Sequence, residues 1–192
     1  MDRGLGSTKP MSRSFESLNI AVIFMGGKDD REALSYSSCV AQHPGVRLTV
    51  IRLLLDTNAN NSSTSAGKKW FKHTEQEEEM KLDDEYFTEF YDKHVAGGKV
   101  AYTERHLINS AAALSTLQSL DKQYALIIVG RGGGVNSTLT VGMSDWRESP
   151  ELGPIGDILS ASDSPVTASI LIIQQHSIKG EIDGLDDDFS IM

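Results

Sequence analysis

The sequence predicts an α/β fold in which a mostly parallel β-sheet carries helices on both faces. Short apolar runs rich in β-branched residues alternate with longer segments whose apolar residues recur at helical spacing. Such alternation is typical of parallel sheets, because consecutive parallel strands need a crossover that is usually a helix. Glycine-rich turns follow two of the predicted strands, at Gly26 and Gly27 and at residues 130–134. If those two strands are neighbours, the turns meet at the carboxyl edge of the sheet, where open α/β folds usually bind ligands.

The size and composition of the chain narrow the range of functions that it can have. With 192 residues, of which 39% are hydrophobic, it is long enough for one domain with a real core. The net charge of -9 argues against nucleic acids and anionic membrane surfaces as partners. No apolar run approaches the ~20 residues that a membrane-spanning helix needs, so we expect no direct insertion into a membrane. The single cysteine, Cys39, fits a reducing compartment, and we expect it to be a buried structural thiol.

The first residues predict a lead-in, a strand and a helix. Residues 1–17 are small, polar and without a pattern, so we expect a flexible lead-in. The apolar residues 18–25 form the first strand. Asp29 and Glu32 are spaced as a capping box, which predicts a helix from there to about residue 42.

A second strand over 46–55 leads into a polar stretch and a long acidic helix. Residues 56–74 are rich in Asn, Ser and Thr and predict a mobile insertion. Apolar residues then recur at helical spacing over 75–96, on a helix with nine acidic residues and one lysine between Glu75 and Asp92. The acidic face is either a solvated surface or a docking surface for a basic partner.

The second half of the chain continues the alternation. It predicts strands over 99–104, 124–129 and 166–175, and helices over 106–120 and 150–161. Residues 177–192 are acidic and interrupted by glycine, which predicts a disordered tail. We therefore expect residues 18–176 to form a single α/β domain.

No residue pattern predicts catalysis. The turn GRGGG lacks the Gly-Lys-Ser/Thr that completes a Walker-type phosphate loop, and it serves either as the wall of a binding crevice or as a tight crossover. The five histidines have no metal-ligand spacing, and the sequence offers no Ser-His-Asp set. We therefore expect neither an enzyme nor a metal site.

Three segments together resemble one family. They are GGKDDREAL at 26–34, IIVGRGGG at 127–134 and GMSDWRESPELGPIGDILSASD at 142–163. They are similar to the cytosolic carboxyl-terminal region of plant cation/proton exchangers, the CHX group of monovalent cation:proton antiporters. The resemblance covers roughly residues 19–175. It implies a regulatory domain on the cytosolic side of an endomembrane or the plasma membrane, with the antiporter's own membrane domain, which exchanges K⁺ for protons, as its partner.

The carboxyl-terminal region of that family is in turn similar to universal stress proteins, a five-stranded fold of order 3-2-1-4-5 that often binds ATP. Their phosphate signature is G-x2-G-x9-G-[ST]. Gly130 and Gly133 satisfy its first half, but Met143 or Pro154 stands where the second half needs a hydroxyl. Proline removes an N–H from the helix start, and Asp157 adds negative charge there. We expect at best weak binding of an adenine nucleotide, and a nucleotide-binding stress sensor is the alternative function.

The predicted crevice is formed by residues from both glycine turns: Gly26, Gly27, Asp29, Asp30, Gly130, Arg131, Gly132 and Gly133. Asp29 and Asp30 either hydrogen-bond a ribose or a purine, as acidic residues after the first strand do in stress proteins, or cap the following helix. Arg131 either pairs with a phosphate or forms an ion pair with one of these aspartates.

The stress-protein strand order places residues 166–175 at the edge of the sheet. This strand carries no charged side chain that would prevent pairing with another copy of the chain. It is apolar on both faces, with Val166, Ala168, Ile170 and Ile172 on one and Leu171 and Ile173 on the other. We expect a homodimer through this edge, unless a tail or helix of the same chain covers it.

Overall fold

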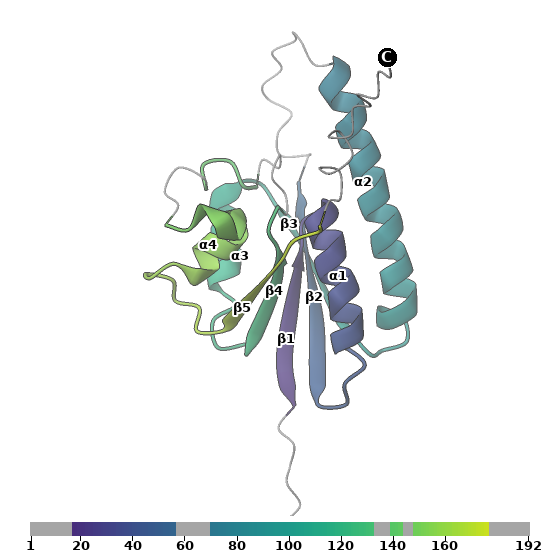
Figure 1. Cartoon of the computed structure of the whole chain (residues 1–192), viewed down its shortest axis with the longest axis vertical. Helices are drawn as coiled ribbons and strands as arrows, with labels where there is room; N and C mark the ends of the chain where they lie inside the picture. Colours follow the sequence, from purple (N-terminus) through teal and green to yellow (C-terminus); the bar gives the residue numbers. More distant parts are fainter. Residues whose placement is uncertain (1–16, 57–69, 133–138, 144–147, 177–192) are drawn as a thin grey trace, which may run out of the picture.

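A computed structural model describes residues 17–56, 70–132, 139–143 and 148–176, without the side chains of 70–76. Their strands form one five-stranded sheet in the order β3-β2-β1-β4-β5, and each pair of neighbours is parallel. The predicted fold class and strand order are therefore confirmed. Figure 1 shows the sheet with helices on both of its faces.

The elements follow the predicted alternation along the chain. In order they are β1 (Leu18–Phe24), α1 (Lys28–Val40), β2 (Val46–Leu55), α2 (Trp70–Phe90), the π-helical turn η2 (Tyr91–Val95), β3 (Ala101–Leu107), α3 (Ser110–Gln118), β4 (Leu126–Gly130), the short 3-10 turn η3 (Pro150–Leu152), α4 (Gly153–Ser160) and β5 (Ser169–Ile173).

The central strand β1 is buried on both faces, which explains its almost unbroken apolar sequence. Successive side chains point to opposite faces of a strand. Ala21 and Ile23 accordingly join a core cluster with α3 and α4, whereas Val22 and Phe24 join a second cluster with α1 and α2. Two helices thus cover each face of the sheet (Figure 1).

Strand β5 lies at the edge of the sheet, as predicted. Its side chains divide between the two faces in the predicted way. Ile170 and Ile172 pack against the cluster under α3 and α4, and Leu171 and Ile173 pack against the cluster under α1 and α2. The helices of this chain therefore cover the faces of β5.

Strand β3 begins and ends later than predicted. It stays in register with β2 until Leu55 lies opposite Leu107, so His106 belongs to the strand and not to the next helix. Asn109 then begins α3, because its side chain accepts a hydrogen bond of 2.9 Å from the backbone N–H of Ala112.

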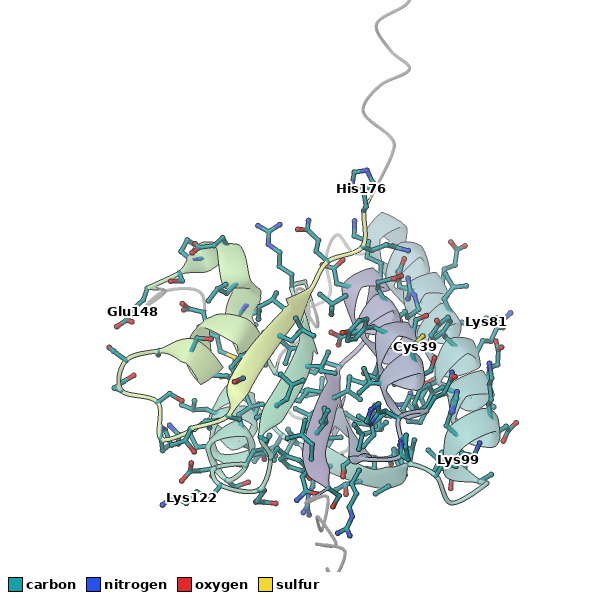
Figure 2. All side chains as sticks on the ribbon, turned by 60° about the horizontal axis from the view of Figure 1, so that its bottom comes forward. Cys39, Lys81, Lys99, Lys122, Glu148 and His176 are labelled. Carbon is teal, nitrogen blue, oxygen red and sulfur yellow. The ribbon has the colours of Figure 1, made fainter. Side chains whose placement is uncertain are left out.

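The start of α1 corrects the capping-box prediction. The residue before this helix is Gly27, with a φ of 97° that favours glycine, and no side chain of α1 caps the helix. Asp29 and Asp30 lie inside the first turn. Cys39, farther along α1, is exposed rather than buried (Figure 2).

Helix α2 begins at Trp70, so residues 70–74 of the segment predicted as an insertion are helical. Residues 57–69 lie outside the described residues, as do most of the predicted lead-in and all of the predicted tail.

Candidate functional site

The two glycine turns meet at the carboxyl edge of the sheet, because β1 and β4 are parallel neighbours. This confirms the prediction that they lie together. The first turn of α1 begins directly after Gly27 and places Asp29 and Asp30 at this edge. Gly133 lies outside the described residues.

Asp29 ties α1 to the ends of two strands. Its side chain is buried, and its two oxygens accept hydrogen bonds of 2.9 Å each, from the backbone N–H of Gly132 and from that of Gln175. Gly132 follows β4 and Gln175 follows β5. Asp29 therefore does not cap α1, and its hydrogen bonding to a ribose or purine stays a prediction. Asp29 joins the carboxyl ends of β4 and β5 to the helix.

Asp30 is buried between the two glycine turns, with 2% of its surface exposed. Its Oδ2 accepts hydrogen bonds from the backbone N–H groups of Met25, at 2.6 Å, and Gly26, at 3.0 Å. A Cβ atom added to Gly130 would lie 2.2 Å from Oδ1 of Asp30, so only glycine fits at the end of β4. Burial raises the pKa of Asp30 to about 7; the N–H groups of Met25, Gly26 and Gly130 oppose this rise, and the nearby Asp83 adds to it.

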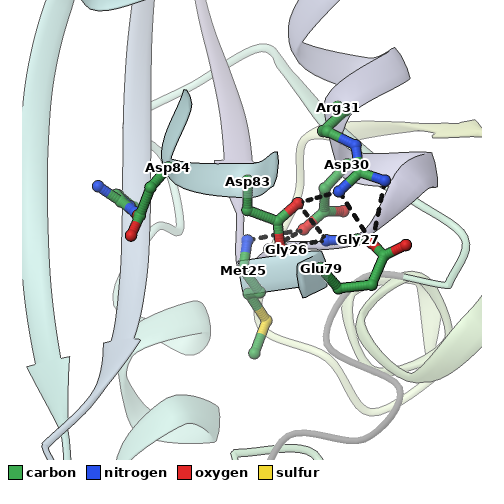
Figure 3. Close-up of polar contacts among 9 residues, drawn as sticks. Met25, Gly26, Gly27, Asp30, Arg31, Glu79, Asp83 and Asp84 are labelled. Carbon is green, nitrogen blue, oxygen red and sulfur yellow. Dashed lines mark hydrogen bonds and ion pairs between the residues drawn. The ribbon is translucent and has the colours of Figure 1, made fainter. Parts of the chain in front are cut away.

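Asp83 of α2, which was not among the predicted site residues, completes the site. Both of its oxygens accept from the backbone N–H of Gly27, at 3.0 and 2.9 Å. A Cβ atom added to Gly26 would lie 2.5 Å from its Oδ2. A carboxylate from α2 thus occupies the positive end of α1, where N–H groups attract anions. Figure 3 shows Asp83 beside Gly26 and Gly27.

A signal for Asp83 was present in the helical spacing of α2. Asp83, Phe87 and Phe90 follow one another at intervals of four and three residues, so they share one face of the helix. Phe87 and Phe90 are buried. A carboxylate on an apolar stripe is unusual and predicts an internal partner.

Arg31 links the two helices by ion pairs. Its Nη1 and Nη2 each lie 3.0 Å from Oε2 of Glu79, and Nη1 also contacts Oδ1 of Asp83. Despite this cation, the pKa of Asp83 is raised, because burial of its carboxyl outweighs the hydrogen bonds from Gly27 and Arg31.

Arg131 binds a backbone carbonyl rather than an aspartate within the described part of the chain, and its pairing with a phosphate stays a prediction. Its Nε donates a hydrogen bond of 2.7 Å to the carbonyl oxygen of Glu151, and no ion pair joins it to Asp29 or Asp30 there. The start of α4 packs directly on the backbone of Arg131: a Cβ added to Gly153 would lie 1.7 Å from the Arg131 carbonyl oxygen. The backbone of Arg131 therefore lies in direct contact with the start of α4.

Two other features of the described residues bear on the site. They contain no group of three or more His, Cys, Asp and Glu side chains able to hold a metal ion. Among the helices in those same residues, none is both long and apolar enough to span a membrane.

A family model and two curated relatives that match this chain come from plant cation/H(+) antiporters. A family model described as "Plant cation/H(+) antiporter, C-terminal domain" matches residues 17–174. Cation/H(+) antiporter 28 of Arabidopsis thaliana is 51% identical over 100% of this chain and 24% of its own length. Cation/H(+) antiporter 15 of the same plant is 38% identical over 92% of this chain and 22% of its own length. This chain thus spans less than a quarter of either antiporter.

Solved structures of universal stress proteins are also similar to this chain. That of Lactobacillus plantarum covers 82% of this chain and 98% of its own, with a TM-score of 0.45 and 14% sequence identity.

Proposed function

The chain belongs to the family of plant cation/H(+) antiporter C-terminal domains, and we propose that it is a non-catalytic regulatory domain of such an antiporter. In this proposal the whole protein exchanges a monovalent cation, K⁺, for protons and contributes to cation and pH homeostasis. The domain lies on the cytosolic side of an endomembrane or the plasma membrane, and its principal partner is the antiporter's own membrane domain.

One observation carries the non-catalytic part of the proposal. At the carboxyl edge of the sheet, the chain's own carboxylates accept hydrogen bonds from the backbone N–H groups of Gly26, Gly27 and Gly132. Such N–H groups bind the phosphates of ligands when they point into an open crevice. Because Asp29, Asp30 and Asp83 already take these donors, the edge is better suited to joining the elements of the domain than to holding a substrate.

The same observation argues against the nucleotide-binding stress sensor. An incoming phosphate would have to displace an aspartate and would face the negative charge of the others. We expect titration calorimetry with ATP or AMP to give a Kd weaker than about 1 μM, which corresponds to about -8 kcal/mol. Tighter binding that is lost in Gly132→Val would favour the sensor instead.

Regulation requires that the domain favours one state of the transporter over another. A domain can shift transport only through different affinities for two arrangements of the membrane domain. The test is ion flux in vesicles that contain the full-length antiporter or the antiporter without this domain. We expect K⁺-dependent proton flux in both, with a changed dependence on cytosolic pH when the domain is missing.

Two results would contradict the proposal. Identical flux at every pH would mean that the domain does not regulate transport. Loss of all flux, with the membrane domain still folded and inserted, would mean that the domain takes part in the transport step itself.

We further propose that two copies pair through the outer edge of β5. Its faces are covered by helices of the same chain, but β5 is the last strand of the sheet, so its outer edge has no neighbouring strand among the described residues. Light scattering at tens of micromolar should give a dimer mass, and Ser169→Lys should reduce it more than Ser160→Lys on α4. A monomer mass would contradict this pairing.

A further inference from the structure

The amino-terminal part of α2 is attached to the domain by polar contacts. Over residues 77–85, here called the acidic half of α2, Asp83 is the one side chain that is not exposed. The buried aromatic residues Phe87 and Phe90 lie beyond it, in residues 86–90, here called the aromatic half. Opening of the acidic half would therefore break ion pairs and hydrogen bonds without exposing an apolar core.

Two carboxyl groups meet at this attachment. Asp30 of α1 accepts from the N–H of Gly26, and Asp83 of α2 accepts from the N–H of the next residue, Gly27. The absence of a side chain on Gly26 permits this approach, since a Cβ there would lie 2.5 Å from Oδ2 of Asp83. Like charges placed this close favour uptake of one proton by the pair (Figure 3).

The geometry indicates that the proton binds to Asp30. The N–H groups of Met25 and Gly26 both donate to Oδ2 of Asp30, so a proton on Oδ1 leaves these two hydrogen bonds in place, while the backbone N–H of Gly130 favours the ionised carboxyl and opposes protonation. Asp83 is engaged through both oxygens with Gly27, and its Oδ1 also contacts the guanidinium of Arg31, so protonation there would disrupt an ion pair. The raised pKa of Asp30, about 7, agrees with this assignment.

Charged residues lie on three of the segments next to Asp30, and among them the charge of Asp83 acts on the pKa of Asp30. These residues are Lys28, Asp29 and Arg31 of α1, Glu79 and Asp83 of α2, and Arg131 after β4. Strands β1 and β5 contribute no charged side chain. Arg31 binds Glu79 and Asp83, and the Nε of Arg131 donates to the Glu151 carbonyl, so no cation is paired with Asp30 in this part of the structure.

We propose that Asp30 and Asp83 form a proton-controlled latch, which holds the acidic half of α2 on α1 when Asp30 is protonated and releases it when Asp30 is ionised. With Asp30 neutral, the Asp83 carboxylate binds Gly27 and Arg31 without a competing charge. With Asp30 ionised, the two carboxylates repel each other across Gly26. The latch belongs to the domain itself, and only its use in regulating transport rests on the proposed function.

The direction of the response follows from linkage. Opening the latch removes the Asp83 carboxylate, whose charge raises the pKa of Asp30, so Asp30 binds a proton more tightly in the closed latch than in the open one. Protonation therefore favours the closed state at low pH, and this preference is lost as the pH rises through about 7. The latch closes as the surroundings become more acidic and opens as they become more alkaline.

Amide hydrogen exchange of the 192-residue chain between pH 5.5 and 8.5 tests the latch, after correction for the intrinsic chemical exchange rate. The opening equilibrium of residues 77–85 should rise by up to about tenfold per pH unit as the pH approaches 7 and should level off above it. Asp30→Asn, which keeps an acceptor for Met25 and Gly26 but has no charge, should hold these residues protected at every pH. Glu78→Gln, an exposed change on the same half, should leave the wild-type response unchanged.

Asp83→Ala provides an independent test from the other side of the latch. Residues 77–85 should then exchange rapidly at every pH, while the aromatic half and the sheet keep their protection. Protection of residues 77–85 that does not change with pH in the wild type would overturn the proposal. The same holds if folded Asp30→Asn retains the wild-type response, or if Asp83→Ala leaves residues 77–85 protected. A working latch in an antiporter whose flux ignores the domain would refute only the proposed function.

Discussion

Helix α2 is attached to the domain in two different ways along its length. The aromatic half inserts Phe87 and Phe90 into the core, where the Phe87 ring packs 5.3 Å from that of Phe24 and 5.5 Å from that of Tyr102. The acidic half is held by Asp83 on Gly27 and by ion pairs with Arg31 and Arg52. One continuous helix thus combines an apolar anchor with a polar one.

The difference shows which part of the helix can respond to a signal. Burial of apolar surface does not depend on protonation, so the aromatic half is expected to stay in place over the physiological pH range. Contacts between ionisable groups change with pH and salt. The acidic half is therefore the part that a proton or a charged partner can move without unfolding the domain.

Removal of the aromatic anchor should cause the largest loss of stability. Phe87→Ala leaves a cavity beneath the Arg52 guanidinium, which lies 4.4 Å from the centre of the Phe87 ring. We expect the free energy of unfolding to fall by about 3–5 kcal/mol, measured by urea denaturation. Glu89→Ala, an exposed change on the same turn, should alter it by less than about 0.5 kcal/mol. Equal effects of the two changes would mean that the aromatic half is not an anchor.

Removal of the polar anchor should lower the free energy of unfolding of the domain by a smaller amount. Asp83→Ala leaves the N–H of Gly27 and the guanidinium of Arg31 without this acceptor. We expect the free energy of unfolding to fall by about 1–3 kcal/mol at pH 6. The neighbouring exposed change Glu85→Ala is the control. A loss as large as that of Phe87→Ala would show that the acidic half contributes to the core as much as the aromatic half.

The pH dependence of stability should carry the signature of Asp30. Because its folded pKa of about 7 lies above its ordinary 3.8, its contribution is complete below about pH 4 and is lost as the pH rises through 7. We expect it to lower the free energy of unfolding by up to about 1.4 kcal/mol per pH unit within that window. Asp30→Asn should remove this contribution. Parallel pH profiles of the two proteins would mean that Asp30 does not titrate near pH 7 in the folded state.

The smallest change of stability with pH should come from His94, in the π-helical turn after the aromatic half. Its sign is opposite to that of Asp30. His94 is buried with its ring 4.8 Å from that of Phe90, and burial lowers its pKa below 6.5, aided by Lys93 and Lys99. The unfolded chain then binds the proton more tightly, so stability rises with pH up to about 6.5. In the Asp30→Asn protein, stability should therefore increase slightly from pH 5 to 6.5, and His94→Gln should abolish that increase. A falling profile would contradict this assignment.

Much of the site could be predicted from the sequence, but not its chemistry. The glycine turns and the two aspartates of α1 were expected at one edge of the sheet, and Asp29 and Asp30 lie there. Their partners were not expected, because the capping-box spacing and the stress-protein resemblance both directed attention to local or ligand contacts. Asp83 lies in a run of acidic residues whose pattern predicts a solvated surface, so its internal contact was not predicted.

The sequence by itself determined the order of the elements, the parallel sheet and the place of the glycine turns, since periodicity and backbone preference act over a few neighbouring residues. Tertiary structure alone decided which groups the aspartates bind. Asp83 meets Gly27 across 56 residues of chain, and Asp29 meets Gly132 across 103. Contacts between residues so far apart in the sequence depend on how the helices pack on the sheet. Only in that packing do the buried Asp30 and the half-buried Asp83 accept hydrogen bonds from consecutive backbone N–H groups.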